Sequence, residues 1–286
     1  MHQNLLHGGH WFNLEPLRLG PPKIRHLRYA QLVGDAALVP TLRGALRVQV
    51  VAHLAAHGVD AFVTTRHGGV SSAPYDTLNL GDHVGDRDHH VQENRRRVAD
   101  AVRVNAGELI FVRQVHGTEI VNGDDVTYPA TGDIVTLATS ARAAAVMVAD
   151  CVPILMVDVT SHRLALVHAG WRGLALGVVS NALTTLPSAP SHLRVVVGPS
   201  ISAASYQIGP EVAEHFVNLP AAVSPDLDDR SRLDLRAVVV AQLVAAGVDR
   251  AAIDVMAAST DGGVTYFSDR AQRPCGRVAF VAKWSS

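Results

Sequence analysis

Short apolar runs alternate along most of the chain with polar loops that contain glycine. Runs of this length, rich in β-branched residues, predict strands. They lie near residues 59–65, 109–115, 143–149, 154–159, 164–167, 193–197, 253–256 and 278–282. Apolar positions at helical spacing predict helices over 91–104, 174–186 and 238–246.

Two of these runs are close enough to form a β-hairpin. Residues 154–159 and 164–167 are separated only by the polar segment 160–163. Several other strands are also joined too tightly for a parallel crossover, which needs about a dozen residues. The chain is therefore predicted to form a single α+β domain with a mixed sheet, not a doubly wound parallel sheet.

Residues 1–48 differ from the rest of the chain. They show no periodicity and contain Gly8-Gly9, Gly20-Pro21-Pro22 and four histidines, His2, His7, His10 and His26. We interpret this segment as an atypical leader, either disordered or added to the natural chain, and place the catalytic domain at 49–286.

Composition and charge exclude several classes of protein. Of 286 residues, 48% are hydrophobic and 18% charged, which excludes an intrinsically disordered chain. The net charge of −1 gives no basic surface for nucleic acid. The sequence has no long apolar window, no secretory leader and only two cysteines, Cys151 and Cys275, so we expect a cytoplasmic protein with no membrane contact and no disulfide framework.

The predicted hairpin brings together residues that could bind a metal. If the chain folds back near residue 161, Cys151 and His168 lie at the same end of the hairpin. His116 also follows an apolar run and precedes a glycine. One thiolate and two imidazoles suit Zn²⁺ and would leave a fourth position open. The spacing alone leaves two alternatives: a buried structural cysteine, or a nucleophilic Cys151 with His168 as its base.

Five sequence segments resemble one known family. In order they are Thr64-Thr65-Arg66-His67-Gly68-Gly69-Val70-Ser71, Thr77-Leu78-Asn79-Leu80-Gly81, Gln114-Val115-His116-Gly117, Ala149-Asp150-Cys151-Val152-Pro153-Ile154 and His168-Ala169-Gly170-Trp171-Arg172-Gly173. Together they resemble the polyphenol-oxidase-type laccase-domain family, also called the YfiH family. The resemblance runs from about residue 48 to the C-terminus.

The resemblance implies a fold, a metal site and an activity. It implies a layered α+β sandwich in which His116, Cys151 and His168 bind a metal, Zn²⁺ or alternatively copper, and in which Arg66 and Asn79 line the active pocket. Family members are assigned as purine nucleoside phosphorylases and adenosine deaminases. The expected reactions are phosphorolysis of adenosine, inosine or methylthioadenosine and hydrolytic deamination of adenosine, with purine nucleosides and phosphate as the small-molecule partners.

Several points stay open at this stage. Phosphate binding by a guanidinium fork is assigned to Arg66, with Arg172 as a further anion-binding candidate. The family often has cysteines where this chain has Ser205 and Ser259, which affects the pocket rim and substrate preference more than the metal ligands. A copper-dependent polyphenol oxidase, a Cys–His hydrolase of a cell-wall precursor and a structural zinc module are the alternatives. Either a monomer or a dimer is compatible with the sequence.

Overall fold

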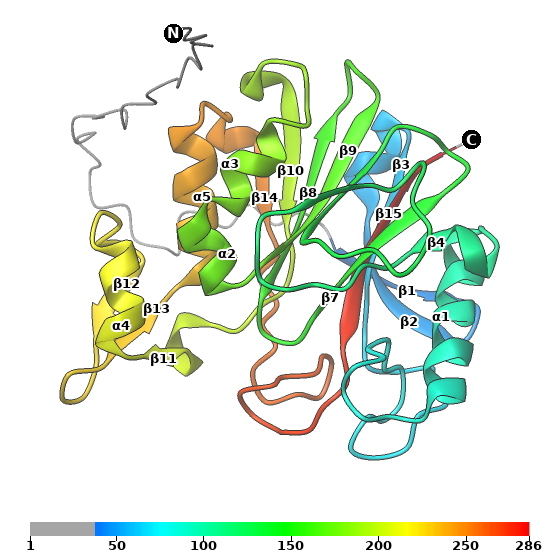
Figure 1. The fold of residues 1–286 in the computed structure, drawn as a ribbon, viewed down its shortest axis with the longest axis horizontal. Coiled ribbons are helices and arrows are strands. Elements are labelled where there is room, and N and C mark those ends of the chain that lie inside the picture. The colour runs from blue at the N-terminus through cyan, green and yellow to red at the C-terminus, as the bar shows by residue number, and fades with distance from the viewer. Residues whose placement is uncertain (1–37, 286) are drawn as a thin grey trace, which may run out of the picture. The chain divides into compact units, whose positions relative to one another are not determined.

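Two six-stranded sheets form the centre of the protein in the computed structural model, which describes residues 38–285 (Figure 1). The strands of the first sheet, in spatial order, are β1 (Leu38–Arg43), β2 (Leu46–Val51), β3 (Val59–Thr64), β15 (Val278–Trp284), β7 (Ala143–Val148) and β4 (Leu109–Ile110). Those of the second are β14 (Ile253–Val255), β10 (Leu193–Val197), β8 (Val152–Asp158), β9 (Arg163–Ala169), β6 (Ile134–Leu137) and β5 (Ile120–Asn122).

Both sheets are mixed. In the first sheet β4 pairs parallel with β7, and in the second β5 with β6 and β14 with β10, while the remaining pairs are antiparallel. A small third sheet contains β11 (Gln207–Ile208), β13 (Ser231–Leu233) and β12 (Val223–Pro225). The predicted α+β fold with a mixed sheet is therefore confirmed.

The helices cover the outer faces of the two sheets. The α-helices are α1 (Asp88–Val102), α2 (Trp171–Leu176), α3 (Val178–Leu183), α4 (Pro210–Ala213) and α5 (Leu235–Ala245). Short 3-10 turns are η2 (Ala52–His57), η3 (Ala106–Glu108), η4 (Pro190–His192), η5 (Ala203–Ser205), η6 (Glu214–Phe216) and η7 (Arg250–Ala252). In Figure 1, α1 lies beside the first sheet, and α2, α3 and α5 lie beside the second.

Alternating side chains of each strand enter different layers of the core, because successive residues of a strand point to opposite faces. In β15, Phe280 packs between the two sheets, whereas Val281 packs toward α1. In β8, Leu155 packs between the sheets and Met156 packs toward α3 and α5. These segments are continuous apolar runs in the sequence because their strands are buried on both faces.

The sequence did not predict several strands, among them β2, β5 and β6, and three further details differ from the prediction. The helix expected over 174–186 is interrupted at Gly177, whose φ of 88° lies in the left-handed region, so α2 ends and α3 begins there. The strand expected over 109–115 ends after Ile110, because the chain leaves the sheet to form a loop. The side chain of Gln114 pairs with the backbone of Met147 there, with both N···O distances at 2.7 Å.

The third difference concerns the N-terminal boundary. Strand β1 begins at Leu38 and pairs with β2, so residues 38–48 belong to the first sheet and not to a separate leader. The rest of the proposed leader, with its four histidines, lies outside the described residues. Within the part of the chain that the structure describes, no helix is long and apolar enough to cross a membrane.

Candidate metal site and active-site pocket

The candidate site lies where the chain crosses from one sheet to the other. Strand β7 of the first sheet ends at Val148 and β8 of the second begins at Val152, so Cys151 lies in the crossing segment. Asp150 and His116 have φ values of 95° and 60°. Non-glycine residues rarely adopt such a backbone conformation, and those that do are concentrated at functional sites.

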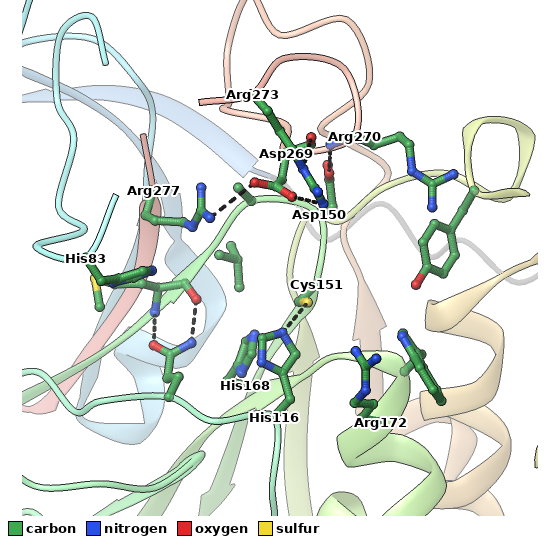
Figure 2. Close-up of a pocket in the computed structure, with 16 residues that line it drawn as sticks. His83, His116, Asp150, Cys151, His168, Arg172, Asp269, Arg270, Arg273 and Arg277 are labelled. Carbon is green, nitrogen blue, oxygen red and sulfur yellow. Dashed lines mark hydrogen bonds and ion pairs between the residues drawn. The ribbon is translucent and has the colours of Figure 1, made fainter. Parts of the chain in front are cut away.

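The hairpin register places the first two candidate ligands together. In the β8–β9 pair, His168 stands opposite Pro153, two residues from Cys151. The expectation that Cys151 and His168 share one end of this hairpin is therefore confirmed. His116 reaches the same point from the loop between β4 and β5, and its Nε2 lies 3.8 Å from Cys151 Sγ (Figure 2).

The three donor atoms have the spacing that a metal ion needs. One ligand atom from each of His116, Cys151 and His168 lies within 4.8 Å of the other two. Tetrahedral zinc bonds of about 2.3 Å to sulfur and about 2.1 Å to nitrogen separate the ligand atoms by roughly 3.4–3.6 Å. The Cys151–His116 pair, at 3.8 Å, would have to close by a few tenths of an ångström, and a pair at the outer limit of 4.8 Å by about 1.4 Å or less, so side-chain movements of this size would let the residues hold a zinc ion.

A buried carboxylate holds two of the candidate ligands. Asp133 is fully buried, and its Oδ1 accepts a hydrogen bond from His168 Nδ1 at 2.7 Å and one from the His116 amide at 3.0 Å. Its Oδ2 accepts from the amides of Val115 and Gly117 at 3.2 and 2.8 Å. With its proton on Nδ1, His168 presents the lone pair of Nε2 to a metal, which is the usual function of a carboxylate behind a histidine ligand.

A glycine gives the ligands the space to approach one another. A Cβ atom on Gly170 would lie 2.7 Å from His116 Cδ2 and 3.0 Å from Cys151 Sγ. Both contacts are shorter than carbon–carbon or carbon–sulfur packing allows, so any larger residue at this position would displace a ligand.

The electrostatics of the cluster favour a thiolate. Burial opposes ionisation of Cys151, but the charge of His168 and a hydrogen bond from His116 outweigh it and lower the pKa of the thiol. Burial also opposes protonation of His168, but Cys151 and Asp133 raise its pKa above the ordinary value for histidine. A thiolate is the form that binds metals and attacks electrophiles, so this arrangement supports Cys151 both as a metal ligand and as a nucleophile.

The three residues line a cavity of about 390 Å³, within the size range of small-molecule sites. Four arginines also line this cavity, Arg172, Arg270, Arg273 and Arg277, together with the aromatic residues Trp171 and Tyr206. The cavity is therefore a positively charged pocket above a candidate metal site (Figure 2).

Arg66 and Asn79 are not among the residues that line this cavity. All three guanidinium nitrogens of Arg66 are bonded within the protein: Nε and Nη2 to Asp76, and Nη1 to the carbonyl of Gly263 at 2.7 Å. Asn79 is fully buried, and its Oδ1 accepts a hydrogen bond from the amide of Arg277 at 2.9 Å. Both side chains therefore support the loop of residues 256–277, which we call the rim loop because it carries three of the four arginines.

Sequence reasoning did not identify Asp133, and within the rim loop it connected Ser259 with the pocket rim but assigned no function to the three arginines. Asp133 is a lone acid next to the apolar run of β6, and such a charge at the start of a buried strand was the available signal. For the rim loop the signal was the spacing of Arg270, Arg273 and Arg277. That spacing indicates a function only in the folded protein, where the rim loop lies against a residue that is more than a hundred positions earlier in the chain.

The fold and the site together define a class: an α+β sandwich that carries one open His–Cys–His site at the crossing between its two sheets. Residues 60–285 match the family described as multi-copper polyphenol oxidoreductase laccase. The chain belongs to this family, which includes YfiH, and the resemblance noted in the sequence is confirmed.

Named relatives lie in the same family. The chain is 38% identical over 222 residues to a protein named purine nucleoside phosphorylase from Mycobacterium tuberculosis, covering 76% of this chain and 88% of that protein. It is 33% identical to purine nucleoside phosphorylase YfiH from Escherichia coli, covering 78% of this chain and 92% of that one.

Solved structures share the fold. YfiH from Bacillus licheniformis superimposes with a TM-score of 0.79 at 28% identity, covering 86% of this chain and 98% of that one. YlmD from Geobacillus stearothermophilus does so with a TM-score of 0.72 at 31% identity, covering 80% and 93% of the two chains.

Proposed function

We propose that this protein is a zinc-dependent enzyme of purine nucleosides. Its main reaction would be phosphorolysis of adenosine, inosine or methylthioadenosine, a transferase activity, and it would also deaminate adenosine hydrolytically. One observation supports this proposal most: His116, Cys151 and His168 converge within 4.8 Å beneath a pocket that four arginines line. The names of the relatives supply the substrate class.

His116, Cys151 and His168 would hold the metal in this proposal. A bound zinc ion supplies a Lewis acid, which polarises water or a substrate oxygen at neutral pH. Asp133 keeps the proton of His168 on Nδ1 and fixes the backbone of the His116 loop. The arginines would attract phosphate and hold this anion beside the ribose, which becomes positively charged as the glycosidic bond breaks.

Arg66 and Asn79 enter the proposal as positioning residues. Arg66 holds Gly263 through a hydrogen bond and lies over the ring of Phe267, with 4.6 Å between the guanidinium carbon and the ring centroid. Asn79 holds the backbone of Arg277. Substitution of either residue is expected to disturb the rim loop and lower activity without removing a direct contact to phosphate.

The copper oxidase reading follows from the description of the family. A multicopper centre needs several metal sites, and within residues 38–285 the cluster of His116, Cys151 and His168 is the only group of potential ligands. We therefore treat phenol oxidation as the competing outcome of the test.

The test measures metal content and nucleoside turnover on the full-length chain. Wild-type protein should carry zinc, convert adenosine only to inosine in phosphate-free buffer, and release free base and ribose 1-phosphate when phosphate is added. Cys151→Ser and His168→Ala should each lose the metal and the activity. Cys275→Ser, which changes the other cysteine, should keep both.

Two results would overturn the proposal. One is metal content equal to wild type in both Cys151→Ser and His168→Ala. The other is intact nucleosides under every condition, with a phenol oxidised and oxygen consumed by the copper-loaded protein.

A further inference from the structure

Two of the four arginines of the pocket are not neutralised by a carboxylate. Arg172 lies over the ring of Trp171, with its guanidinium carbon 4.4 Å from the ring centroid. Arg270 lies over the ring of Tyr206 at 4.9 Å, and its Nη1 donates a hydrogen bond to the carbonyl of Gln207 at 3.0 Å. Among the described residues, neither guanidinium forms an ion pair with an acid.

The other two arginines share one acid. Asp269 forms ion pairs with both Arg273 and Arg277, the latter at 3.3 Å. Figure 2 shows Arg277 on the opposite side of Cys151 from Arg172 and Arg270. Arg172 and Arg270 are therefore the two arginines of the pocket whose guanidinium groups no carboxylate of the described residues binds.

Aromatic stacking orients these two guanidinium groups without using all of their donors. A guanidinium stacked on a ring still presents N–H groups at its edge, and its planar fork fits two oxygens of a phosphate. The remaining N–H groups of Arg172 and Arg270 are therefore free to face the cavity that both residues line.

Tyr206 adds a hydroxyl donor at the same place. Its hydroxyl makes no hydrogen bond within residues 38–285, and the charges of Cys151, Arg270 and Arg172 all act on it. Burial, followed by the charge of Cys151, raises the pKa of Tyr206 to about 12. The phenol therefore keeps its proton at neutral pH and can donate it in a hydrogen bond to an anion.

Asp150 fixes Arg270 relative to the candidate metal ligand. Its carboxylate is buried and accepts hydrogen bonds from Thr260 Oγ1 at 2.6 Å and from the amide of Arg270 at 2.7 Å. Because Asp150 directly precedes Cys151, these two bonds tie the rim loop to the crossing segment. Asp150 is a positioning residue in this arrangement.

We propose that Arg172, Arg270 and the hydroxyl of Tyr206 form the subsite for inorganic phosphate, the co-substrate of the reaction, and that Arg66 takes no direct part in it. This inference rests on the proposed function for its identification of phosphate as a reactant. In the reaction, a phosphate oxygen forms a bond to C1′ of the ribose while the bond from C1′ to the purine nitrogen breaks. The electron pair of that bond leaves with the purine, and the proton carried by HPO₄²⁻ ends on the purine nitrogen, so no other reactant is needed.

The first measurement is phosphate binding without turnover. Inorganic phosphate is titrated into the full-length, metal-loaded protein by calorimetry. Arg270→Gln and Arg172→Gln should each weaken binding by about tenfold or more, since each removes hydrogen bonds to a charged ligand. Arg270→Lys keeps the charge but not the fork and should fall between wild type and Arg270→Gln. Tyr206→Phe should weaken binding by a smaller factor.

Arg163→Gln is the matched control for loss of positive charge. Arg163 is exposed at the far end of β9 from His168 and lies outside the pocket. If phosphate were attracted only by diffuse positive charge, all three glutamine variants would weaken phosphate binding to a similar extent. A subsite predicts that Arg163→Gln binds phosphate as wild type does.

The second measurement is inosine phosphorolysis with each substrate varied in turn. In Arg270→Gln and Arg270→Lys the KM for phosphate should rise, while the KM for inosine stays within about twofold of wild type. Asp150→Asn should raise the KM for phosphate and keep wild-type secondary structure by circular dichroism.

The two proposals fail in different ways. If phosphate binds and the arginine variants lose it while no nucleoside is cleaved, the subsite stands and the proposed function falls. If nucleosides are phosphorolysed but Arg270→Gln, Arg270→Lys and Arg172→Gln all bind phosphate as wild type does, the subsite is refuted and the proposed function stands.

Discussion

Replacement of Asp133 by asparagine tests whether one buried carboxylate organises the metal ligands. Asp133 Oδ1 accepts hydrogen bonds from the His168 side chain and the His116 amide, and Oδ2 accepts them from the amides of Val115 and Gly117. In asparagine one of these oxygens becomes an NH₂ group. If the NH₂ takes the place of Oδ2, it faces the two amides of Val115 and Gly117, and two hydrogen bonds are lost. If it takes the place of Oδ1, the bond from the His116 amide is lost, and the bond to His168 is kept only if the proton of His168 moves from Nδ1 to Nε2.

The structure gives a magnitude for the loss. A buried donor left without a partner costs about 1–3 kcal/mol. One or two such donors would lower the free energy of unfolding by about 1–6 kcal/mol, and the lower half of that range is expected because the His116 side chain and its loop are partly exposed to water. If the NH₂ faces His168, the proton of His168 moves to Nε2 and the metal loses its lone pair. Loss of such a partner lowers metal affinity by about 10- to 100-fold.

The assay combines a zinc competition titration against a chelator with urea unfolding. Asp158→Asn is the matched control, because Asp158 is also fully buried and accepts backbone hydrogen bonds from Thr160, Ser161 and Ser188, but at the far end of the same hairpin. Asp158→Asn should lose stability and keep its zinc affinity. Zinc affinity in Asp133→Asn within about twofold of wild type would refute the reasoning.

The difference in stability between wild type and Asp133→Asn should depend on pH with a definite sign. Burial opposes ionisation of Asp133, but His168 and the backbone amides outweigh it and hold the pKa of the carboxyl below its ordinary value. A lowered folded pKa contributes stability above the unfolded value of about 3.9, and that stability is lost as the pH falls through the folded pKa. The stability difference between wild type and Asp133→Asn should therefore be largest near neutral pH and narrow below about pH 4.

Two further substitutions test the packing of the site and of the rim loop. Gly170→Ala should lower zinc affinity by about tenfold or more, because its Cβ would overlap His116 and Cys151. Gly107→Ala is the control and should keep its zinc affinity, because a Cβ there meets no atom within 4 Å. Equal zinc affinities of the two variants in the chelator titration would contradict this expectation. Tyr266→Phe should raise the free energy of urea unfolding by about 1 kcal/mol, because it removes a buried hydroxyl that has no hydrogen-bond partner among the described residues. A lower free energy of unfolding would show that this hydroxyl does form a hydrogen bond.

Local patterns in the sequence determined many of the strands, the hairpin, and the proximity of two of the three candidate ligands. The apolar runs that became β7, β8 and β9 are buried on both faces, so burial alone made them recognisable. A hairpin with a short loop has few possible registers, and this restriction is enough to place Cys151 near His168. His116 was a candidate because it follows an apolar run and precedes a glycine, and the motif resemblance then supported all three ligands and added the family.

Only the tertiary structure decided which residues complete the site, because those contacts join segments that are distant in the chain. Arg66, the sequence candidate for phosphate, is instead bonded on all three guanidinium nitrogens, two of them to Asp76, within the same loop. Arg270 reaches the pocket because its amide is bonded to Asp150, 120 residues earlier. Asp133, which directly precedes β6, joins His116 and His168. A periodic pattern reports which face of a strand is buried, but it carries no information about which distant loop closes over that strand, and this closure is what builds the pocket.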